Sequence, residues 1–341
     1  MKFIHLSDVH LSDDLDFSGT YSSLIRENIW ISLKKILNEN MDVDFLLIAG
    51  DLYERNFFTL KQYKRLFSIF ENFKKDIYYV GGNHDYINKD NEFFLNYKPS
   101  NIHIFPSDEI SYFERENIRI YGISYDDRIF NKKFSYNINL DKNFYNILLI
   151  HANIGDNSNY LNIDIEKLEK IGFSYVGLGH IHKFQKIRDN IFYPSSIEPR
   201  DFSESGNHGY IKVEDKKIKF INSSLMDFKD LSLYGEDFDN YNKLIHYLLD
   251  EKEKKYNFLD LNLINFDKNI FDQEKIKKDT AYTYIKFNWL KENENKELGE
   301  IFPNSLLSKY IREFDNKDMK DSIVKKAFDL GIDAILRSKD G

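Results

Sequence analysis

Five short apolar runs in residues 1–182 each lead into an aspartate, an asparagine or a histidine, and this arrangement constrains the fold more than any other feature. The runs are FIHL, DFLLIAG, IYYVGG, NILLIH and SYVGLG. Longer segments separate them, and residues 22–40 show apolar side chains at the three- and four-residue intervals of an amphipathic helix. Strands that alternate with helices predict an α/β core with a largely buried sheet.

The polar residues after these runs are of the types that bind metals or transfer protons. They are Asp8, His10, Asp51, Asn83, His84, Asp85, His151, His180 and His182. The carboxyl ends of strands in an α/β sheet meet at one crevice, so five strand ends can deliver these side chains to one place. The pairs Asp8/His10 and His180/His182 are two residues apart, which directs both members to the same side of an extended chain.

Seven of these residues predict a site for two divalent metal ions. They are Asp8, His10, Asp51, Asn83, His151, His180 and His182. Two such ions carry four positive charges and the two carboxylates remove two, so a charge of about +2 remains to bind a phosphate ester. Ligands without sulfur favour manganese, iron or zinc, and Asp51 has two oxygens with which to bridge the metals. The other histidines are interpreted as core or surface residues: His5, His103, His208 and His246.

Composition excludes several classes of protein. The chain of 341 residues contains no cysteine, which excludes disulfides, thiolate zinc sites and iron–sulfur clusters and is consistent with a cytoplasmic protein. No apolar stretch approaches the roughly 18–20 residues of a membrane-spanning helix, so we expect no integral membrane protein. The net charge of −8 is spread along the chain, and bulk charge therefore predicts no strong nucleic-acid binding by the chain alone.

Changes in the apolar pattern predict four segments. Residues 1–225 carry all the metal motifs and end in short strands, with a hairpin turn at DKK. Residues 226–290 contain two helices and two strands, which predicts a smaller α+β domain. Residues 291–302 are polar and are expected to form an exposed connection, and residues 303–341 read as two amphipathic helices that pack on the core or dock a partner.

The order of the motifs resembles that of the calcineurin-like metallophosphoesterase family. The family pattern is D-x-H, G-D, G-N-H-D, an isolated His and G-H-x-H, and it stands here as DVH, GD, GNHD, His151 and GHIH between residues 8 and 182. The resemblance implies a four-layer α-β-β-α sandwich and metal-dependent hydrolysis of phosphomonoesters or phosphodiesters by a metal-activated water. It implies two ligand sets, Asp8, His10, Asp51 and His182 for one metal and Asp51, Asn83, His151 and His180 for the other.

The same resemblance implies catalytic roles for the two residues after Asn83. His84 would stabilise charge on the phosphoryl group or protonate the leaving oxygen, and Asp85 beside it would orient its ring.

A narrower resemblance is to the bacterial DNA repair exonucleases of the SbcD and YhaO type. It rests on HLSDVHLS, AGDLYER and GHIHKFQKI…FYPSSIEPRDFSESGNHGYIKVE, within residues 1–225. It implies a DNA exonuclease or endonuclease that acts on single- or double-stranded ends with an SbcC-type ATPase, using Mn²⁺, with Fe²⁺ or Zn²⁺ as alternatives. Residues 226–290 would then be a cap that sorts single strands from duplexes, and a homodimer is left open.

One position departs from this resemblance, and two other functions remain open. Archaeal and eukaryotic nucleases of the superfamily carry His three residues after the bridging Asp, where this chain has Glu54. The metal motifs do not separate a nuclease from a small-molecule phosphodiesterase or a protein phosphatase. A scaffold subunit with a decayed site is the non-enzyme alternative, and the complete ligand set disfavours it.

Overall fold

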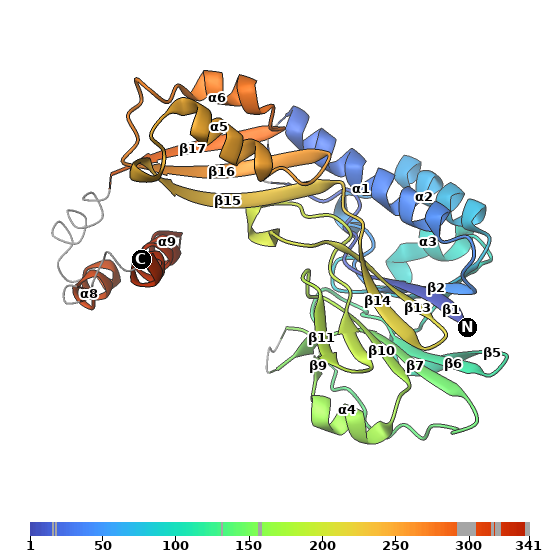
Figure 1. The fold of residues 1–341 in the computed structure, drawn as a ribbon. Coiled ribbons are helices and arrows are strands. Elements are labelled where there is room, and N and C mark those ends of the chain that lie inside the picture. The colour runs from blue at the N-terminus through green and yellow to red at the C-terminus, as the bar shows by residue number, and fades with distance from the viewer. Residues whose placement is uncertain are drawn as a thin grey trace. The chain divides into compact units, whose positions relative to one another are not determined.

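The computed structural model describes residues 1–15, 17, 19–130, 132–155, 159–291, 305–314, 317 and 322–337. The chain divides into two compact units. The first unit is Met1–Phe228 with Lys254–Tyr256, and the second unit is Lys229–Glu253 with Asn257–Gly341 (Figure 1).

Two six-stranded sheets form the first unit. One sheet has the order β14-β13-β1-β2-β3-β4 and the other the order β11-β12-β10-β7-β6-β5. The strands of the first sheet are β1 (Lys2–Leu6), β2 (Phe45–Ala49), β3 (Asp76–Val80), β4 (Ile102–Ile104), β13 (Gly209–Glu214) and β14 (Lys217–Asn222). Those of the second are β5 (Ser111–Arg115), β6 (Ile118–Ile123), β7 (Tyr145–His151), β10 (Tyr175–Gly179), β11 (Gln185–Arg188) and β12 (Ile191–Tyr193).

The strands that carry the metal motifs are parallel in both sheets. Strands β1 to β4 pair in parallel in the first sheet, and β6, β7, β10 and β12 do so in the second. Their carboxyl ends therefore lie at one edge of each sheet. Antiparallel strands close the outer sides, because β13 pairs with β1 and β14, β11 with β12, and β5 with β6.

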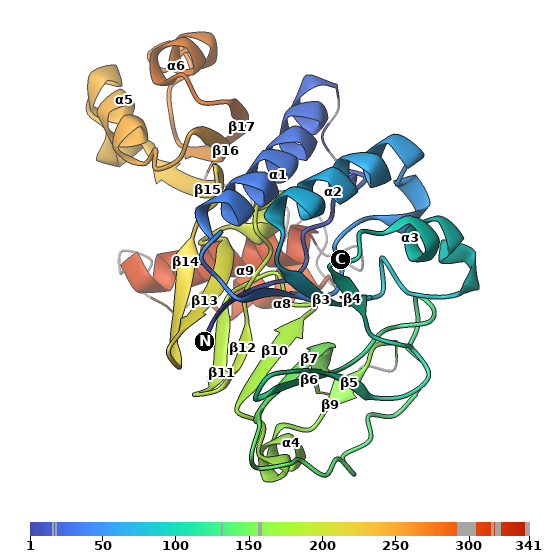
Figure 2. The ribbon, with the colours of Figure 1, turned by 90° about the vertical axis from the view of Figure 1, so that its right-hand side faces the viewer.

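The two sheets pack face to face around one buried apolar core. Phe45 and Leu47 from the first sheet and Ile147 and Leu149 from the second belong to this core and are fully buried. Helices cover the outer faces: α1 (Thr20–Glu39), α2 (Leu60–Phe73) and α3 (Glu92–Tyr97) lie over the first sheet, and α4 (Ile165–Ile171) over the second (Figures 1 and 2). This arrangement confirms the four-layer α-β-β-α sandwich.

Short elements complete the first unit. They are the strands β8 (Asn153–Ile154) and β9 (Asn162–Ile163) and the 3₁₀ turns η1 (Arg55–Phe57), η2 (Lys89–Asn91) and η3 (Phe202–Glu204). The hairpin expected at DKK joins β13 to β14, where Asp215 and Lys216 have φ angles of 49° and 66°. Two successive left-handed residues give the turn the twist that a two-residue hairpin needs.

The second unit contains a three-stranded sheet with two helices on one face. Its strands follow the order β15-β16-β17, with bounds β15 (Met226–Tyr234), β16 (Tyr256–Ile264) and β17 (Tyr284–Leu290). The helices are α5 (Tyr241–Asp250) and α6 (Gln273–Thr280), and η4 (Gly235–Asp237) precedes them. Alternate residues of β16, Leu259, Leu261 and Leu263, pack in one cluster with Leu244 of α5 and Ile276 of α6.

Near the C-terminus, in the second unit, α8 (Leu306–Arg312) and α9 (Ser322–Arg337) form a helical pair. Leu307 and Ile311 of α8 pack against Phe328 and Ile332 of α9. The polar connection expected at 291–302 lies outside the described residues from 292 onward. Among the helices in the described part of the chain, none combines the length and apolarity needed to cross a membrane.

Candidate metal centre

The ends of five parallel strands place the candidate metal ligands together. Asp8 and His10 follow β1, Asp51 follows β2, and Asn83 follows β3 in the first sheet, while His151 ends β7 in the second sheet. His180 and His182 follow β10, which pairs with β7. The chain thus brings donors from both sheets to the carboxyl ends of their strands, where the sequence predicted a crevice.

Distances between the donor atoms show how closely the side chains approach. Ligand atoms of Asp8, His10 and His182 lie within 4.8 Å of one another, and so do those of Asp8, Asp51 and His151. The Nε2 atoms of His10 and His182 are 3.2 Å apart. His151 Nε2 lies 3.3 Å from Asp51 Oδ2.

Asn83 and His180 complete the seven predicted ligand positions. Asn83 Oδ1 lies 3.0 Å from His151 Nε2. The ring of His180 meets that of His151 edge to face, with centroids 5.3 Å apart, and its backbone N–H donates to both carboxylate oxygens of Asp8 at 3.1 Å. The predicted set therefore surrounds a common centre.

Hydrogen bonds outside the cluster fix the tautomers of two histidines and hold a third by its Nδ1. His151 Nδ1 lies 2.9 Å from the carbonyl oxygen of Ala49, which can only accept, so Nδ1 carries the proton and Nε2 keeps its lone pair. His10 Nδ1 is paired in the same way with the carboxylate of Glu54 at 2.9 Å. His182 Nδ1 pairs with Glu204. Each Nε2 then faces the centre, where its lone pair can bind a metal. Metal-binding histidines are commonly held in this way through the other ring nitrogen.

Burial keeps two of the imidazoles in the neutral form that binds metals. Burial, with the positive charges around the site, lowers the pKa of His10 well below its usual range. Burial and the neighbouring His151 lower the pKa of His180 to about 4. Neutral imidazole and carboxylate donors with no sulfur fit two divalent cations of the manganese, iron or zinc type.

The backbone of the ligand loops adopts conformations that non-glycine residues rarely take. Asp8, His10, Asp51 and His180 have φ angles of 52°, 49°, 52° and 104°. Each left-handed residue costs on the order of 1–2 kcal/mol, which the surrounding structure must offset. The Asp51 side chain lies so close to the backbone of residue 82 that only glycine fits there, because a Cβ would collide with Asp51 Oδ1.

His84 lies beside the ligand cluster and pairs with Glu54. Its Nδ1 is 2.6 Å from Glu54 Oε1, the same oxygen that holds His10. Burial by itself lowers the pKa of His84, but the hydrogen bond to Glu54 and the charges of Asp51, Glu54 and Asp85 raise it to about 9. These acidic neighbours favour the imidazolium form of His84, and its side chain is 28% exposed, so a substrate can reach it.

Asp85 makes its hydrogen bonds to backbone groups. Its carboxylate accepts from the N–H groups of Asp51 at 3.0 Å, Leu52 at 2.5 Å and Gly82 at 2.6 Å. The family resemblance predicted that Asp85 orients the ring of His84. The structure instead places Glu54 on the His84 ring, while Asp85 ties together the loops after β2 and β3.

Two further residues support the cluster, and the sequence alone did not identify their role. Glu204 holds His182 Nδ1 and also accepts from Arg200 at 2.7 Å. The hydrogen bond from His182 and the charge of Arg200 outweigh burial and hold the pKa of Glu204 far below its usual range. Glu204 follows His182 by 22 residues and returns through η3, so no local spacing indicates the pair.

Two other basic residues near the motifs have structural partners. Arg55 donates to the carbonyl oxygen of Tyr86 at 3.0 Å and to Asn88 Oδ1 at 2.8 Å. His5 is fully buried and pairs with the Tyr175 hydroxyl at 3.0 Å, in agreement with its interpretation as a core residue.

Comparisons with known proteins identify a family and two similar proteins. Residues 1–184, more than half of the chain, match the model of the family described as calcineurin-like phosphoesterase. A curated relative, "Uncharacterized metallophosphoesterase YhaO" of Bacillus subtilis (strain 168), is 31% identical over 237 residues, which are 62% of this chain and 57% of the relative. The chain thus spans less than two thirds of that relative's length. A solved structure of a dimetal phosphatase from Danio rerio is 10% identical with a TM-score of 0.39, covering 62% of this chain and 91% of that one.

Proposed function

The chain belongs to the calcineurin-like phosphoesterase family, whose members act on phosphoester bonds, and from this premise we propose that it is a two-metal nuclease that hydrolyses DNA. The observation that carries the proposal is the convergence of carboxylate, amide and neutral imidazole donors, with three Nε2 atoms fixed toward one centre. A cluster of this composition binds divalent cations and, through them, an anionic phosphodiester.

Two sets of residues would hold the metals. The first is Asp8, His10, Asp51 and His182, and the second is Asp51, Asn83, His151 and His180. When bound, the two ions supply Lewis-acid catalysis, neutralising phosphoryl charge and lowering the pKa of the attacking water. We propose Mn²⁺ as the working metal, with Fe²⁺ and Zn²⁺ as alternatives that the same donors accept.

His84 supplies the proton for the leaving oxygen in this proposal. Its acidic neighbours favour the protonated ring and Glu54 occupies its Nδ1, which leaves the Nε2–H free to donate. Glu54 is thus the positioning residue for His84 and for His10 together. The Glu at this position, which departs from the archaeal and eukaryotic relatives, has a defined place in the site.

DNA is the proposed substrate because of the sequence after the last metal motif. The stretch from GHIH to GYIKVE resembles the nuclease subunits of SbcCD-like complexes, and it supplies Glu204 to the site as well as β11 to β13. Residues 226–290 would act as the cap that sorts single-stranded from duplex DNA. The net charge of −8 supports a requirement for a partner, and we propose an SbcC-type ATPase.

The test is degradation of end-labelled linear DNA in the presence of Mn²⁺, with bis-p-nitrophenyl phosphate assayed in parallel. We expect the protein to degrade DNA and the His84→Asn variant to lose this activity, which controls for a contaminating nuclease. Hydrolysis of the small ester with DNA untouched, even with the ATPase added, would assign the protein to the small-substrate phosphodiesterases.

A further inference from the structure

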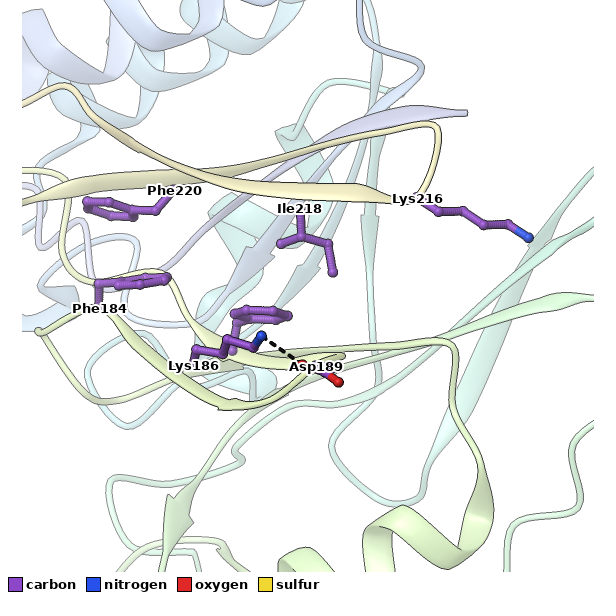
Figure 3. Close-up of a pocket in the computed structure, with 7 residues that line it drawn as sticks. Phe184, Lys186, Asp189, Lys216, Ile218 and Phe220 are labelled. Atoms are coloured by element: carbon purple, nitrogen blue, oxygen red, sulfur yellow. Dashed lines mark ion pairs between the residues drawn. The ribbon is translucent and has the colours of Figure 1, made fainter.

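A shallow groove opens where the edge strands of the two sheets face each other in the first unit. Strand β14 is the outermost strand of one sheet and β11 that of the other. Figure 3 shows the residues between them, which we call the β11–β14 groove; it has a volume of about 310 Å³. The residues that line it are Phe184, Lys186, Asp189, Phe192, Lys216, Ile218 and Phe220.

Aromatic side chains line one end of the groove, and one of them closely follows the last metal motif in the sequence. Phe184 and Phe220 stack with centroids 4.5 Å apart and an interplanar angle of 28° (Figure 3). Phe184 remains 37% exposed. It lies two residues after His182, and therefore within about 7 Å of this metal donor along the chain.

Positive charge accompanies these rings in a chain that is acidic overall. Residues 183–189 and 214–222 contain six lysine or arginine residues against three acidic ones, whereas the whole chain has a net charge of −8. Lys186 pairs with Asp189 at 2.7 Å, but both side chains are more than half exposed, so the pair is weak and exchangeable. Lys216 has no ion pair within the described residues.

The hollow does not end at Lys216. A second hollow of about 270 Å³ begins there and is lined by Met1, Asn117, Tyr145 and Asp215 among others. Two consecutive hollows that share one lysine form a track rather than a single closed pocket. A track suits an extended polymer better than a small molecule.

Edge strands often carry lysine because it prevents pairing with other sheets. That role explains Lys217 and Lys219, which are exposed, but it requires no exposed ring at Phe184. Rings on which bases stack, followed by lysines that contact phosphates, are instead the features of surfaces that bind single-stranded nucleic acid.

We infer that the β11–β14 groove binds a single DNA strand that continues from the metal centre, with bases on Phe184 and Phe220 and phosphates on Lys216. This inference rests on the proposed nuclease function and adds to it the path of the strand. A nuclease with this groove prefers single-stranded substrates that extend past the scissile bond.

Binding of a fluorescein-labelled 12-mer of deoxythymidine to the full chain in EDTA tests the inference. EDTA prevents cleavage and removes metal anchoring, so the anisotropy measures the contribution of the groove. We expect Phe220→Ala to weaken binding about tenfold through lost stacking, and Phe220→Trp to retain it. Lys216→Glu is expected to weaken binding and to lower the slope of log Kd against log salt by about 0.7.

Controls separate this inference from the proposed function. Lys142→Glu reverses an exposed charge elsewhere in the first unit and should bind like the wild type. Phe220→Leu keeps apolar volume without a ring and replaces Phe220→Ala if the latter fails to fold. All variants should hydrolyse bis-p-nitrophenyl phosphate at the wild-type rate.

Two outcomes have different meanings. A wild type that binds and degrades single strands, with Phe220→Leu and Lys216→Glu binding equally well, would overturn the groove and leave the nuclease function standing. A wild type that neither binds the 12-mer nor degrades DNA, even with an SbcC-type ATPase added, would overturn the proposed function itself.

Discussion

His84 is accessible to solvent, and Glu54 fixes its Nδ1, so it can act on a substrate without binding a metal. We expect His84→Asn to reduce turnover about 100- to 10,000-fold because it removes the proton donor. Metal analysis should still find two ions per chain. His84 also lies within 4.8 Å of ligand atoms of His10 and Asp51. Loss of one metal equivalent in the variant would therefore show that His84 is a ligand and not the acid.

Glu54 orients His84 through a hydrogen bond. Comparing a substrate that has a poor leaving group with one that has a good leaving group tests this role. Glu54→Gln should slow cleavage of DNA at least about tenfold, because the alkoxide of the sugar is a poor leaving group unless it is protonated. It should affect bis-p-nitrophenyl phosphate much less, since p-nitrophenolate leaves unaided. Equal losses on both substrates would mean that Glu54 acts through metal binding by His10 instead.

Glu198 is a buried carboxyl in the first unit whose titration should change stability. It is 1% exposed and accepts from the backbone N–H groups of Leu225 at 2.6 Å and Met226 at 3.0 Å, and from Ser32. Burial raises its pKa from 4.5 to about 7. The folded protein therefore binds this proton more tightly than the unfolded chain, and stability falls as pH rises from about 4.5 to about 7.

The expected size of this effect is roughly 2–3 kcal/mol between pH 5 and pH 7.5. Urea unfolding at several pH values should show a smaller fall in unfolding free energy for Glu198→Gln than for the wild type. A Trp289→Phe background leaves Trp30 as the fluorescent reporter of the first unit, since the chain has two tryptophans. Parallel pH curves for the two proteins would contradict the shift.

The sequence predicted where the metal donors sit, because each follows an apolar run that becomes a parallel strand. It did not predict which acid holds which histidine. Glu54 was noted as a departure from the relatives, but its contact with His84 depends on the path of the loop after β2. Glu204 reaches His182 across 22 residues, and that distance carries no periodic signal.

Helix ends offer a matched pair of substitutions. Lys74 follows α2 with φ 59°, and Gly172 follows α4 with φ 88°, where a Cβ would meet no atom of the described residues within 4 Å. We expect Lys74→Gly to stabilise the first unit by about 1 kcal/mol and Gly172→Ala to destabilise it by a similar amount. Thermal unfolding measures both. Shifts of the same sign would show that side-chain contacts outweigh the backbone term.

Elements with strong periodicity were predicted to within a few residues. The helix expected at 22–40 spans Thr20–Glu39, and the DKK turn lies at the end of β13. The first of the two helices expected within residues 226–290 spans Tyr241–Asp250. Asn240 caps its first turn by accepting from the N–H of Lys243, a local signal that apolar spacing does not contain.

Metal binding should stabilise the entire first unit, because the donors join both of its sheets. Mn²⁺ at about 100 times its Kd should add about 2.7 kcal/mol to the unfolding free energy, and EDTA should remove this gain. Differential scanning calorimetry of the wild type and of Asp51→Asn checks the prediction, since the variant lacks the bridging carboxylate. An equal Mn²⁺ response in Asp51→Asn would place the ions elsewhere.

The layers of the first unit follow from the order of apolar runs together with the family resemblance. The partition of donors between two sheets did not follow from the runs themselves. Strand pairing decides it: β1, β2 and β3 are neighbours in one sheet, and β7 and β10 in the other. Parallel neighbours can be distant in sequence, and apolar periodicity reports the existence of a strand rather than its partner.

Because the metal donors are far apart in the sequence, the site can form only late in the synthesis of the chain. His10 and His182, whose Nε2 atoms meet, are 172 residues apart. A ribosome that adds about 5–20 residues per second needs roughly 10–30 seconds between them. Strand β1 likewise waits for β13 before its second edge is covered. A nascent chain therefore carries Asp8 and His10 unassembled through most of its translation, and the first unit should acquire its metals only after the ribosome has passed residue 214.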